Sequence, residues 1–172
     1  MGNPPMVSLP ARRIVAVIDS DPDTTEMLKT ILEIHGFVAA TGNLNEFRLG
    51  KEDLIAFLQR TPPDVIVYDL GIPYEANYHF LQNARADPGF PACPVVITTT
   101  NASVLHELLG LHAIQIMGKP YDLEALVKAV QQAADDPDAA HDRTDPAQQS
   151  RDNRRHGDRR RGSARPEEGS LH

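Results

Sequence analysis

Acidic, hydroxyl and basic side chains recur at the ends of short apolar runs in this chain. They are Asp19, Ser20 and Asp21 after the first run, Asp69 after the third, Thr99 after the fourth and Lys119 after the fifth. Several carboxylates that share one crevice repel each other unless some are protonated or a cation lies among them. Oxygen ligands without His or Cys favour Mg²⁺ or a similar hard ion over zinc. These residue types therefore indicate a site for a hard divalent cation.

A carboxylate in such a site can also be a nucleophile. Beside a metal, a hydroxyl and a lysine, an Asp can accept a phosphoryl group, because the metal and the lysine offset charge on the transferring oxygens. A dinucleotide site would need the pattern G-x-G-x-x-G after the first strand, where this chain has DSDPD. Bare carboxylates repel phosphate, which argues against nucleotide or flavin binding at this point without a metal.

The apolar runs predict five strands, because they are short, continuous and rich in β-branched residues, as in strands covered on both faces. The runs are 14–18, 37–41, 65–68, 95–98 and 114–117. Amphipathic segments between and after them predict five helices. These are expected to run from Asp21-Pro22 to a stop at Gly36, around 54–58, near 78–85, around 104–109 and over 122–133.

This alternation predicts the α/β class, with a doubly wound five-stranded parallel sheet and helices on both faces. Ligands of such sheets bind beyond the carboxyl ends of the strands. If the first and third strands are neighbours, Asp19, Asp21 and Asp69 converge at one edge of the sheet. The polar residues that follow the strands are therefore the expected functional site.

Composition excludes several classes of protein. The chain has 172 residues, a formal net charge of -7 and 41% hydrophobic residues, which is ordinary for a globular protein. One cysteine, Cys93, excludes an intramolecular disulfide framework and a multi-cysteine zinc site. No apolar run is long enough for a membrane span and no signal peptide is recognised, so a cytoplasmic protein without membrane insertion is expected.

The charge is distributed unevenly. Residues 1–140 carry 9 basic and 18 acidic residues, whereas residues 141–172 carry 8 and 6. Residues 135–172 lack apolar periodicity, and they are predicted to be a disordered Arg/Asp-rich tail. Weak contact of this tail with nucleic acid is a minor alternative, because it has no aromatic side chains for stacking and no folded scaffold.

In four places the sequence resembles the receiver domain of two-component response regulators. The motifs are Asp19 and Asp21 after the first strand, Asp69 in DVIVYDLGIP, Thr99 in PVVITTT and Lys119-Pro120-Tyr121 after the fifth strand. Each motif alone is weak, but all four occur in order, each at the end of a predicted strand. The resemblance covers roughly residues 12–134, which we assign as the receiver domain, with residues 1–11 as an N-terminal extension.

The resemblance implies a flavodoxin-like sheet with strand order 2-1-3-4-5 and a Mg²⁺-dependent switch. Asp69 would be the phosphoacceptor for a histidine kinase or phosphotransfer protein. Asp19, Asp69 and the Gly71 carbonyl would hold Mg²⁺, with Ser20 or Asp21 as further candidates. Thr99 and Lys119 would bind the phosphoryl group, and the peptide bond before Pro120 would be cis.

The expected function is that of a single-domain response regulator, not an enzyme, which signals by phosphorylation-dependent binding to a downstream protein. Three positions depart from the family. Ser20 stands where a second acid is usual, Ile116 where a switching aromatic is usual, and Asn77 where Gly is usual in the turn after Pro73. Residues 45–50 form an apparent insertion. The alternative is a degenerate receiver that binds its partner without phosphorylation.

Overall fold

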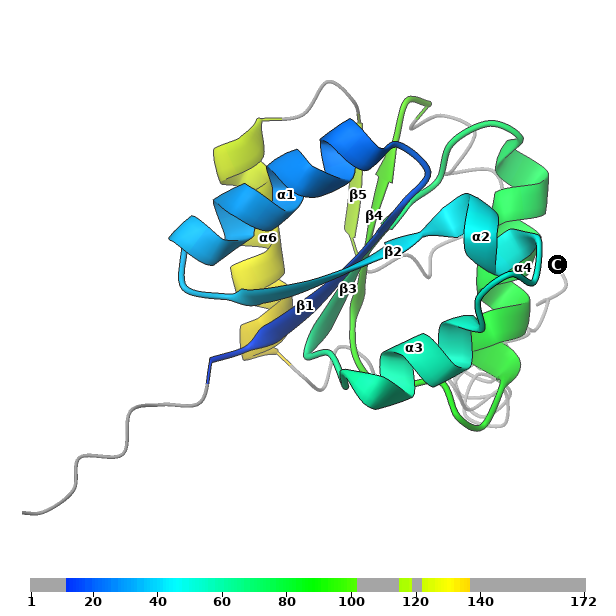
Figure 1. The fold of residues 1–172 in the computed structure, drawn as a ribbon. Coiled ribbons are helices and arrows are strands. Elements are labelled where there is room, and N and C mark those ends of the chain that lie inside the picture. The colour runs from blue at the N-terminus through cyan, green and yellow to red at the C-terminus, as the bar shows by residue number, and fades with distance from the viewer. Residues whose placement is uncertain (1–11, 102–114, 119–121, 137–172) are drawn as a thin grey trace, which may run out of the picture. The chain divides into compact units, whose positions relative to one another are not determined.

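The computed structural model describes residues 12–101, 115–118 and 122–136. Its centre is a five-stranded parallel sheet with the order β2-β1-β3-β4-β5 (Figure 1). The strands are β1 (Ile14–Asp19), β2 (Val38–Asn43), β3 (Val65–Asp69), β4 (Val95–Thr99) and β5 (Gln115–Gly118). The predicted fold class and strand order are confirmed.

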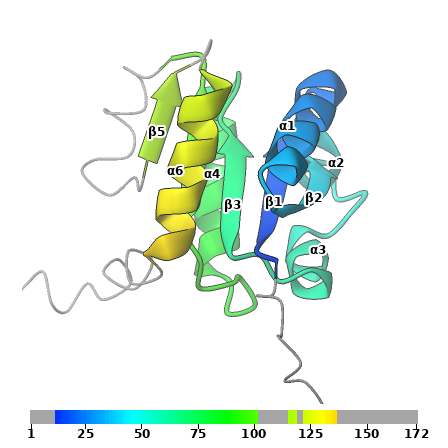
Figure 2. The ribbon, with the colours of Figure 1, turned by 90° about the vertical axis from the view of Figure 1, so that its left-hand side faces the viewer.

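Helices cover both faces of the sheet (Figures 1 and 2). Those described are α1 (Pro22–Ile34), α2 (Leu44–Arg48), α3 (Leu54–Arg60), α4 (Tyr74–Ala86) and α6 (Leu123–Asp135). Helices α1 and α6 pack on one face, and α2, α3 and α4 pack on the other. The helix expected around residues 104–109 lies outside the described residues, as do residues 1–11 and most of the tail. The boundaries at 12 and 134 stay predictions.

Alternation along the strands separates two apolar cores, because successive side chains of a strand point to opposite faces. The α1/α6 core takes Val15 and Val17 from β1, Val65 and Val67 from β3, and Val96 from β4. The α2/α3/α4 core takes Ala16 and Ile18, Ile66 and Tyr68, and Val95 and Ile97 from the same strands. A side chain's position in a strand therefore decides which set of helices it meets.

The ends of α1 follow the predicted signals. The Asp21 side chain accepts a hydrogen bond from the Asp23 backbone N–H, and Pro22 is the first helical residue. After the helix, Gly36 has a φ of 88°, which a side chain would disfavour. Leu28 and Leu32 are the buried residues of α1, whereas Met27, next to Leu28, is 43% exposed. The buried stripe of α1 is therefore narrow.

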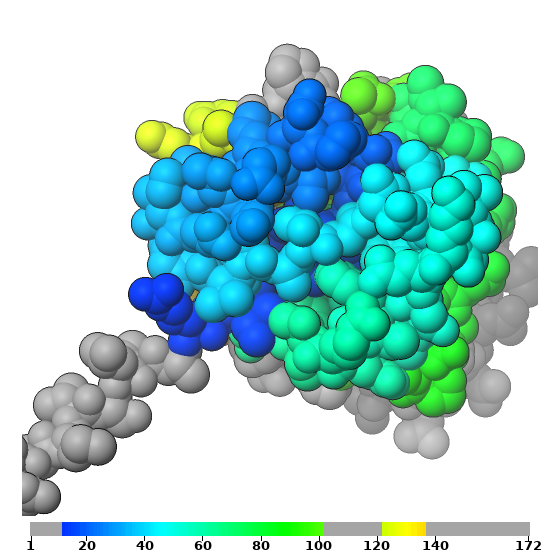
Figure 3. Space-filling view, in the orientation of Figure 1, coloured from blue at the N-terminus to red at the C-terminus, as the bar shows by residue number. Residues whose placement is uncertain are grey.

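The apparent insertion around residues 45–50 contains helix α2, which belongs partly to the core. Phe47 is 4% exposed, and its ring lies 5.4 Å from that of Phe57, centroid to centroid. A Cβ on Gly42 would lie 2.5 Å from the Phe47 ring, so a side chain there would collide with it. Side chains of α1, β2, α2 and α3 make up most of the surface seen in Figure 3. Phe47 thus anchors this segment to the sheet.

Candidate functional site

Two buried carboxylates end neighbouring strands. Asp19 is the last residue of β1 and is 2% exposed, and Asp69 is the last residue of β3 and is 6% exposed. Both continue the alternation of the valines that face α1 and α6, so they lie on the same face of the sheet. Burying a carboxylate is costly unless hydrogen bonds or a cation stabilise its charge. The pair is therefore suited to holding a cation.

Asp21 serves mainly as the cap of α1. Its Oδ1 accepts from the Asp23 N–H at 3.2 Å, and its Oδ2 accepts from the Thr24 hydroxyl at 2.6 Å. Its own backbone N–H donates to Asp19 Oδ1 at 2.9 Å. The loop therefore fixes Asp19, while both carboxylate oxygens of Asp21 serve the helix. Ser20, the other candidate ligand, is half-buried between them.

The two threonines at the end of β4 have different partners. Thr98 pairs with Asp69 in the register of β3 and β4, and its Oγ1 donates to Asp69 Oδ1 at 3.3 Å. The Thr99 hydroxyl, which we expected to bind phosphoryl, donates to the Leu70 carbonyl at 2.9 Å. Both threonines are fully buried. Thr98 was not among the residues expected at the site, because its contact with Asp69 follows from the register of β3 with β4 rather than from the order of the strands.

Asn77 was expected in the turn after Pro73, and that prediction is wrong. It lies in the first turn of α4, and no described residue other than glycine has a positive φ. Its side chain is 3% exposed, and Nδ2 donates to the Gly71 carbonyl at 2.8 Å. Among the described residues its Oδ1 has no hydrogen-bond partner. The Asn77 side chain therefore holds the loop that follows Asp69.

Tyr68 extends this connection from the sheet to α4. Its hydroxyl donates to the Asn77 carbonyl at 2.9 Å, inside the α2/α3/α4 core. Burial raises the pKa of Tyr68 well above its ordinary value, because the phenolate would lose its hydration. The phenol therefore stays protonated and remains a donor at neutral pH.

The oxygen atoms at this edge of the sheet are of the type that a hard cation prefers. Two carboxylates and the Gly71 carbonyl are all oxygen ligands, and Mg²⁺ commonly uses one or two carboxylates with waters and phosphate oxygens. Gly71 has no Cβ, and one added there would lie 3.2 Å from Asp69 Oδ2. That leaves the Asp69 carboxylate less crowded. In the described part of the chain, no three His, Cys, Asp or Glu side chains gather into a metal cluster.

Two of the predicted site residues lie outside the described part of the chain. Lys119 and Pro120 fall outside the described residues, so the cis bond expected before Pro120 stays a prediction. The Ile72–Pro73 bond, in the loop after Asp69, is cis.

Burial, with a smaller contribution from Asp64, raises the pKa of Cys93 to about 12. Burial therefore disfavours the thiolate, which is the reactive form of a cysteine.

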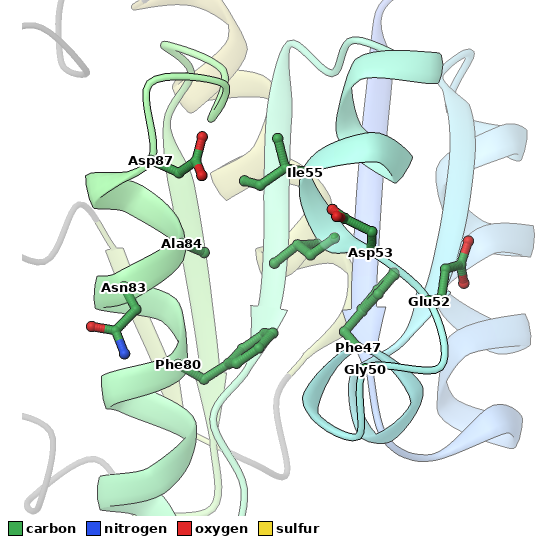
Figure 4. A pocket seen from close by; sticks show the side chains of 10 residues that line it. Phe47, Gly50, Glu52, Asp53, Ile55, Phe80, Asn83, Ala84 and Asp87 are labelled. Carbon is green, nitrogen blue, oxygen red and sulfur yellow. The ribbon is translucent and has the colours of Figure 1, made fainter.

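A hollow of about 320 Å³ lies between α3 and α4, away from the predicted site residues (Figure 4). Phe47, Leu54, Ile55 and Phe80 give it apolar walls, and Glu52, Asp53 and Asp87 are also among its lining residues. Asp53 caps α3, and Glu52 pairs with Arg60, so these acids already have structural roles. The hollow is thus separate from the acidic edge of the sheet.

This fold and this acidic edge define a class of signalling protein. The profile of the response regulator receiver domain matches residues 15–131, and the chain belongs to that family. Proteins of this family generally signal rather than catalyse. No helix in the described residues is long and apolar enough to cross a membrane.

Particular relatives support the same assignment. Protein Rrf1 of Nitratidesulfovibrio vulgaris is 28% identical over 73% of this chain and 83% of its own length. Response regulator Rre1 of Synechocystis is 27% identical over 70% of this chain, but the match spans only 53% of Rre1. The chain therefore aligns with most of one relative and with about half of the other.

Solved structures share the fold. The chemotaxis response regulator CheY4 of Vibrio cholerae has a TM-score of 0.55 and 21% identity, covering 72% of this chain and 99% of that one. A response regulator of Thermotoga maritima gives a TM-score of 0.56 at 21% identity, covering 72% and 98%. At this identity the likeness concerns the fold.

Proposed function

We propose that this chain is a phosphorylation-dependent switch that accepts a phosphoryl group on Asp69. The observation that carries the proposal is the pair Asp19 and Asp69, buried on one face at the ends of neighbouring strands. Asp19, Asp69 and the Gly71 carbonyl would hold Mg²⁺, with Ser20 as a further candidate and Asp21 mainly engaged in capping. Bound there, the metal would offset negative charge on the transferring phosphoryl oxygens.

The chain's own residues would then perform a displacement at phosphorus. A carboxylate oxygen of Asp69 attacks the phosphorus of a phosphohistidine, and the P–N bond breaks with its electron pair going to the imidazole. Lys119 and Thr99 are proposed to contact the phosphoryl oxygens. Because the Thr99 hydroxyl now donates to the Leu70 carbonyl, that contact requires the side chain to exchange one partner for the other.

Partners follow from this chemistry. A histidine kinase or a phosphotransfer protein would supply the phosphoryl group, and a downstream protein would bind the phosphorylated form preferentially. Phosphorylation would shift a balance between two conformations by its differential contacts with them. We place this exchange in the cytoplasm.

The direct test is incubation with acetyl phosphate, with and without Mg²⁺, followed by intact-mass analysis. We expect one added phosphoryl group with Mg²⁺ and none with EDTA. Asp69→Asn should remove the adduct, whereas Asp23→Asn, which changes an exposed acid of α1, should keep it. An adduct that persists in Asp69→Asn would refute the assignment of the phosphoacceptor.

A degenerate receiver is the second candidate function. Ser20 occupies the place of the usual second acid, and Asp21 uses both carboxylate oxygens to cap α1. The loop therefore offers fewer strong metal ligands than the family pattern. Beryllofluoride with Mg²⁺ distinguishes the two functions, since a switch should show altered backbone amide resonances around Asp69. An unchanged spectrum, with no adduct from acetyl phosphate, would favour constitutive binding.

A further inference from the structure

The two carboxylate oxygens of Asp69 have different surroundings. Oδ1 accepts the hydrogen bond from the Thr98 hydroxyl at 3.3 Å. Oδ2 lies toward Gly71, where an added Cβ would approach it to 3.2 Å. Thr98 is fully buried and Asp69 is 6% exposed, so water competes little for this contact. The protein thus distinguishes the two oxygens before any phosphoryl group arrives.

The orientation of Thr98 is fixed by the sheet. Thr98 and Asp69 are register partners on adjacent parallel strands, and both side chains lie on the face of α1 and α6. Thr99 follows the opposite alternation and bonds to the Leu70 carbonyl. The contact between Thr98 and Asp69 is therefore independent of the hydroxyl that we propose for phosphoryl binding.

We propose that Thr98 is a positioning residue that directs the phosphoryl group to Asp69 Oδ2 and shortens the lifetime of the aspartyl phosphate. The inference rests on the proposed function of Asp69. Its physical basis is charge: a carboxylate carries negative charge on both oxygens, whereas the Oδ1 of an acyl phosphate is a nearly neutral carbonyl oxygen. A hydrogen bond to an ionised acceptor is the stronger of the two.

The hydrolysis step shows where this difference acts. A water oxygen attacks phosphorus, the P–Oδ2 bond breaks, and its electron pair returns to the carboxylate. Inorganic phosphate leaves, and the proton released by the water passes to phosphate or solvent. As negative charge returns to Asp69, it delocalises onto Oδ1, where the Thr98 hydroxyl stabilises it. The leaving group is therefore better with Thr98 than without it.

The matched variants are Thr98→Val, which keeps the shape but removes the hydroxyl, and Thr98→Ser, which keeps the hydroxyl. Each protein is phosphorylated with acetyl phosphate and Mg²⁺, the donor is removed, and decay is followed by intact mass at constant Mg²⁺. Because 3.3 Å is long for this bond, the expected effect is small. We expect Thr98→Val to lengthen the half-life about threefold. Thr98→Ser should restore a half-life close to that of the wild type.

A second readout does not depend on phosphorylation. The carboxylate ¹³C resonance of Asp69 in the metal-free protein should shift in Thr98→Val and much less in Thr98→Ser, because only the former loses the donor. Urea unfolding of each variant ensures that the fold is retained. A variant with altered folding is replaced by Thr98→Ala, with the same expectations.

The outcomes separate this inference from the function on which it rests. If the wild type forms no adduct, the proposed function fails, while the Asp69 resonance still tests the contact. If the wild type is phosphorylated but Thr98→Val decays at the same rate, the role of Thr98 is overturned and Asp69 stays the phosphoacceptor. Slower decay in Thr98→Val without recovery in Thr98→Ser would also overturn it, since bulk rather than the hydroxyl would be responsible.

Discussion

The two faces of the sheet differ most at its carboxyl edge. On the face of α1 and α6, the apolar alternation ends in Asp19, Asp69 and Thr98, and the Thr98 hydroxyl donates to Asp69 Oδ1 at 3.3 Å. On the other face, Tyr68 and Thr99 donate to backbone carbonyls of Asn77 and Leu70. One face therefore carries Asp69, the proposed phosphoacceptor, and the other connects the same strand ends to α4 and the loop before it. Thr99 lies on the second face, so its proposed contact with the phosphoryl group requires it to leave the Leu70 carbonyl.

This difference shows how one strand can serve two purposes. Tyr68 and Asp69 are consecutive, yet their side chains point to opposite faces. The loop after Asp69 links the acidic edge to α4, because Asn77 Nδ2 donates to the carbonyl of Gly71, which is a proposed metal ligand. A change at the acidic edge has a short hydrogen-bonded route to the first turn of α4.

The largest expected effects come from the two cores, which should contribute equally to stability. Leu32 on α1 and Leu81 on α4 are both almost fully buried, one in each core. Leu32→Ala and Leu81→Ala should each lower the free energy of unfolding by about 2–5 kcal/mol, through lost burial and a new cavity. Urea unfolding measures both. A loss below 1 kcal/mol for only one of them would show that the faces are not equivalent in packing.

A smaller effect is expected on the binding of Mg²⁺ at the acidic edge of the sheet. Ser20→Asp adds a carboxylate beside Asp19, and we expect it to tighten Mg²⁺ binding by about tenfold, or about 1.4 kcal/mol. Isothermal titration with Mg²⁺ gives the affinity, and Ser20→Asn supplies a neutral control of similar size. Unaltered affinity in Ser20→Asp would mean that position 20 does not face the cation.

Asp21 tests the division of roles within the loop after β1. Asp21→Ala should lower the free energy of unfolding by about 1 kcal/mol, because it removes the cap of α1. The phosphorylated fraction should stay near that of the wild type, whereas Asp19→Ala should strongly reduce it. Thermal unfolding and intact mass measure the two effects. Loss of the adduct in Asp21→Ala would assign Asp21 to the metal site instead.

Tyr68→Phe should slightly lower the stability of the protein, through a contact on the face of α2, α3 and α4. It removes the bond to the Asn77 carbonyl and should lower the free energy of unfolding by about 1 kcal/mol at pH 7. The pKa of Tyr68 is raised in the folded protein, so its neutral form favours folding below pH 10, its ordinary pKa, and that contribution is lost as the pH rises further.

The wild type should therefore lose more stability than Tyr68→Phe between about pH 10 and pH 12, and the difference between them should shrink or reverse. Urea unfolding at a series of pH values measures this. A difference that stays constant with pH would contradict the burial of a neutral phenol. Cys93, also raised in pKa, is present in both proteins and cancels in the comparison.

The sequence predicted what depends on local pattern. Apolar runs located the strands, and Asp21 and Asp122 were recognised at the starts of α1 and α6, where both accept capping hydrogen bonds. What the sequence could not supply was the register between strands distant in the chain. Tertiary packing sets that register, and a shift of one residue moves a side chain to the other face. Thr99 was singled out because it follows the predicted fourth strand and matches the family motif, whereas the contact of Thr98 with Asp69 depends on the register.

Asn77 and Phe47 show a second limit. Asn77 was assigned to the turn after Pro73 from the family pattern, but it lies in α4, where its side chain bonds to the Gly71 carbonyl and its own carbonyl to the Tyr68 hydroxyl. Phe47 lay in an apparent surface insertion, and its burial follows from its packing against Phe57. In both cases the environment comes from another segment of the chain, where local propensity carries no information.

The most direct test of the central claim is to locate the phosphoryl group on the chain. After reaction with acetyl phosphate and Mg²⁺, borohydride reduces an aspartyl phosphate to homoserine, and peptide sequencing by mass spectrometry identifies its position. We predict homoserine at position 69 alone, dependent on Mg²⁺. Homoserine at position 19 or 21, or none despite a phosphorylated intact mass, would contradict the assignment of Asp69 as the phosphoacceptor.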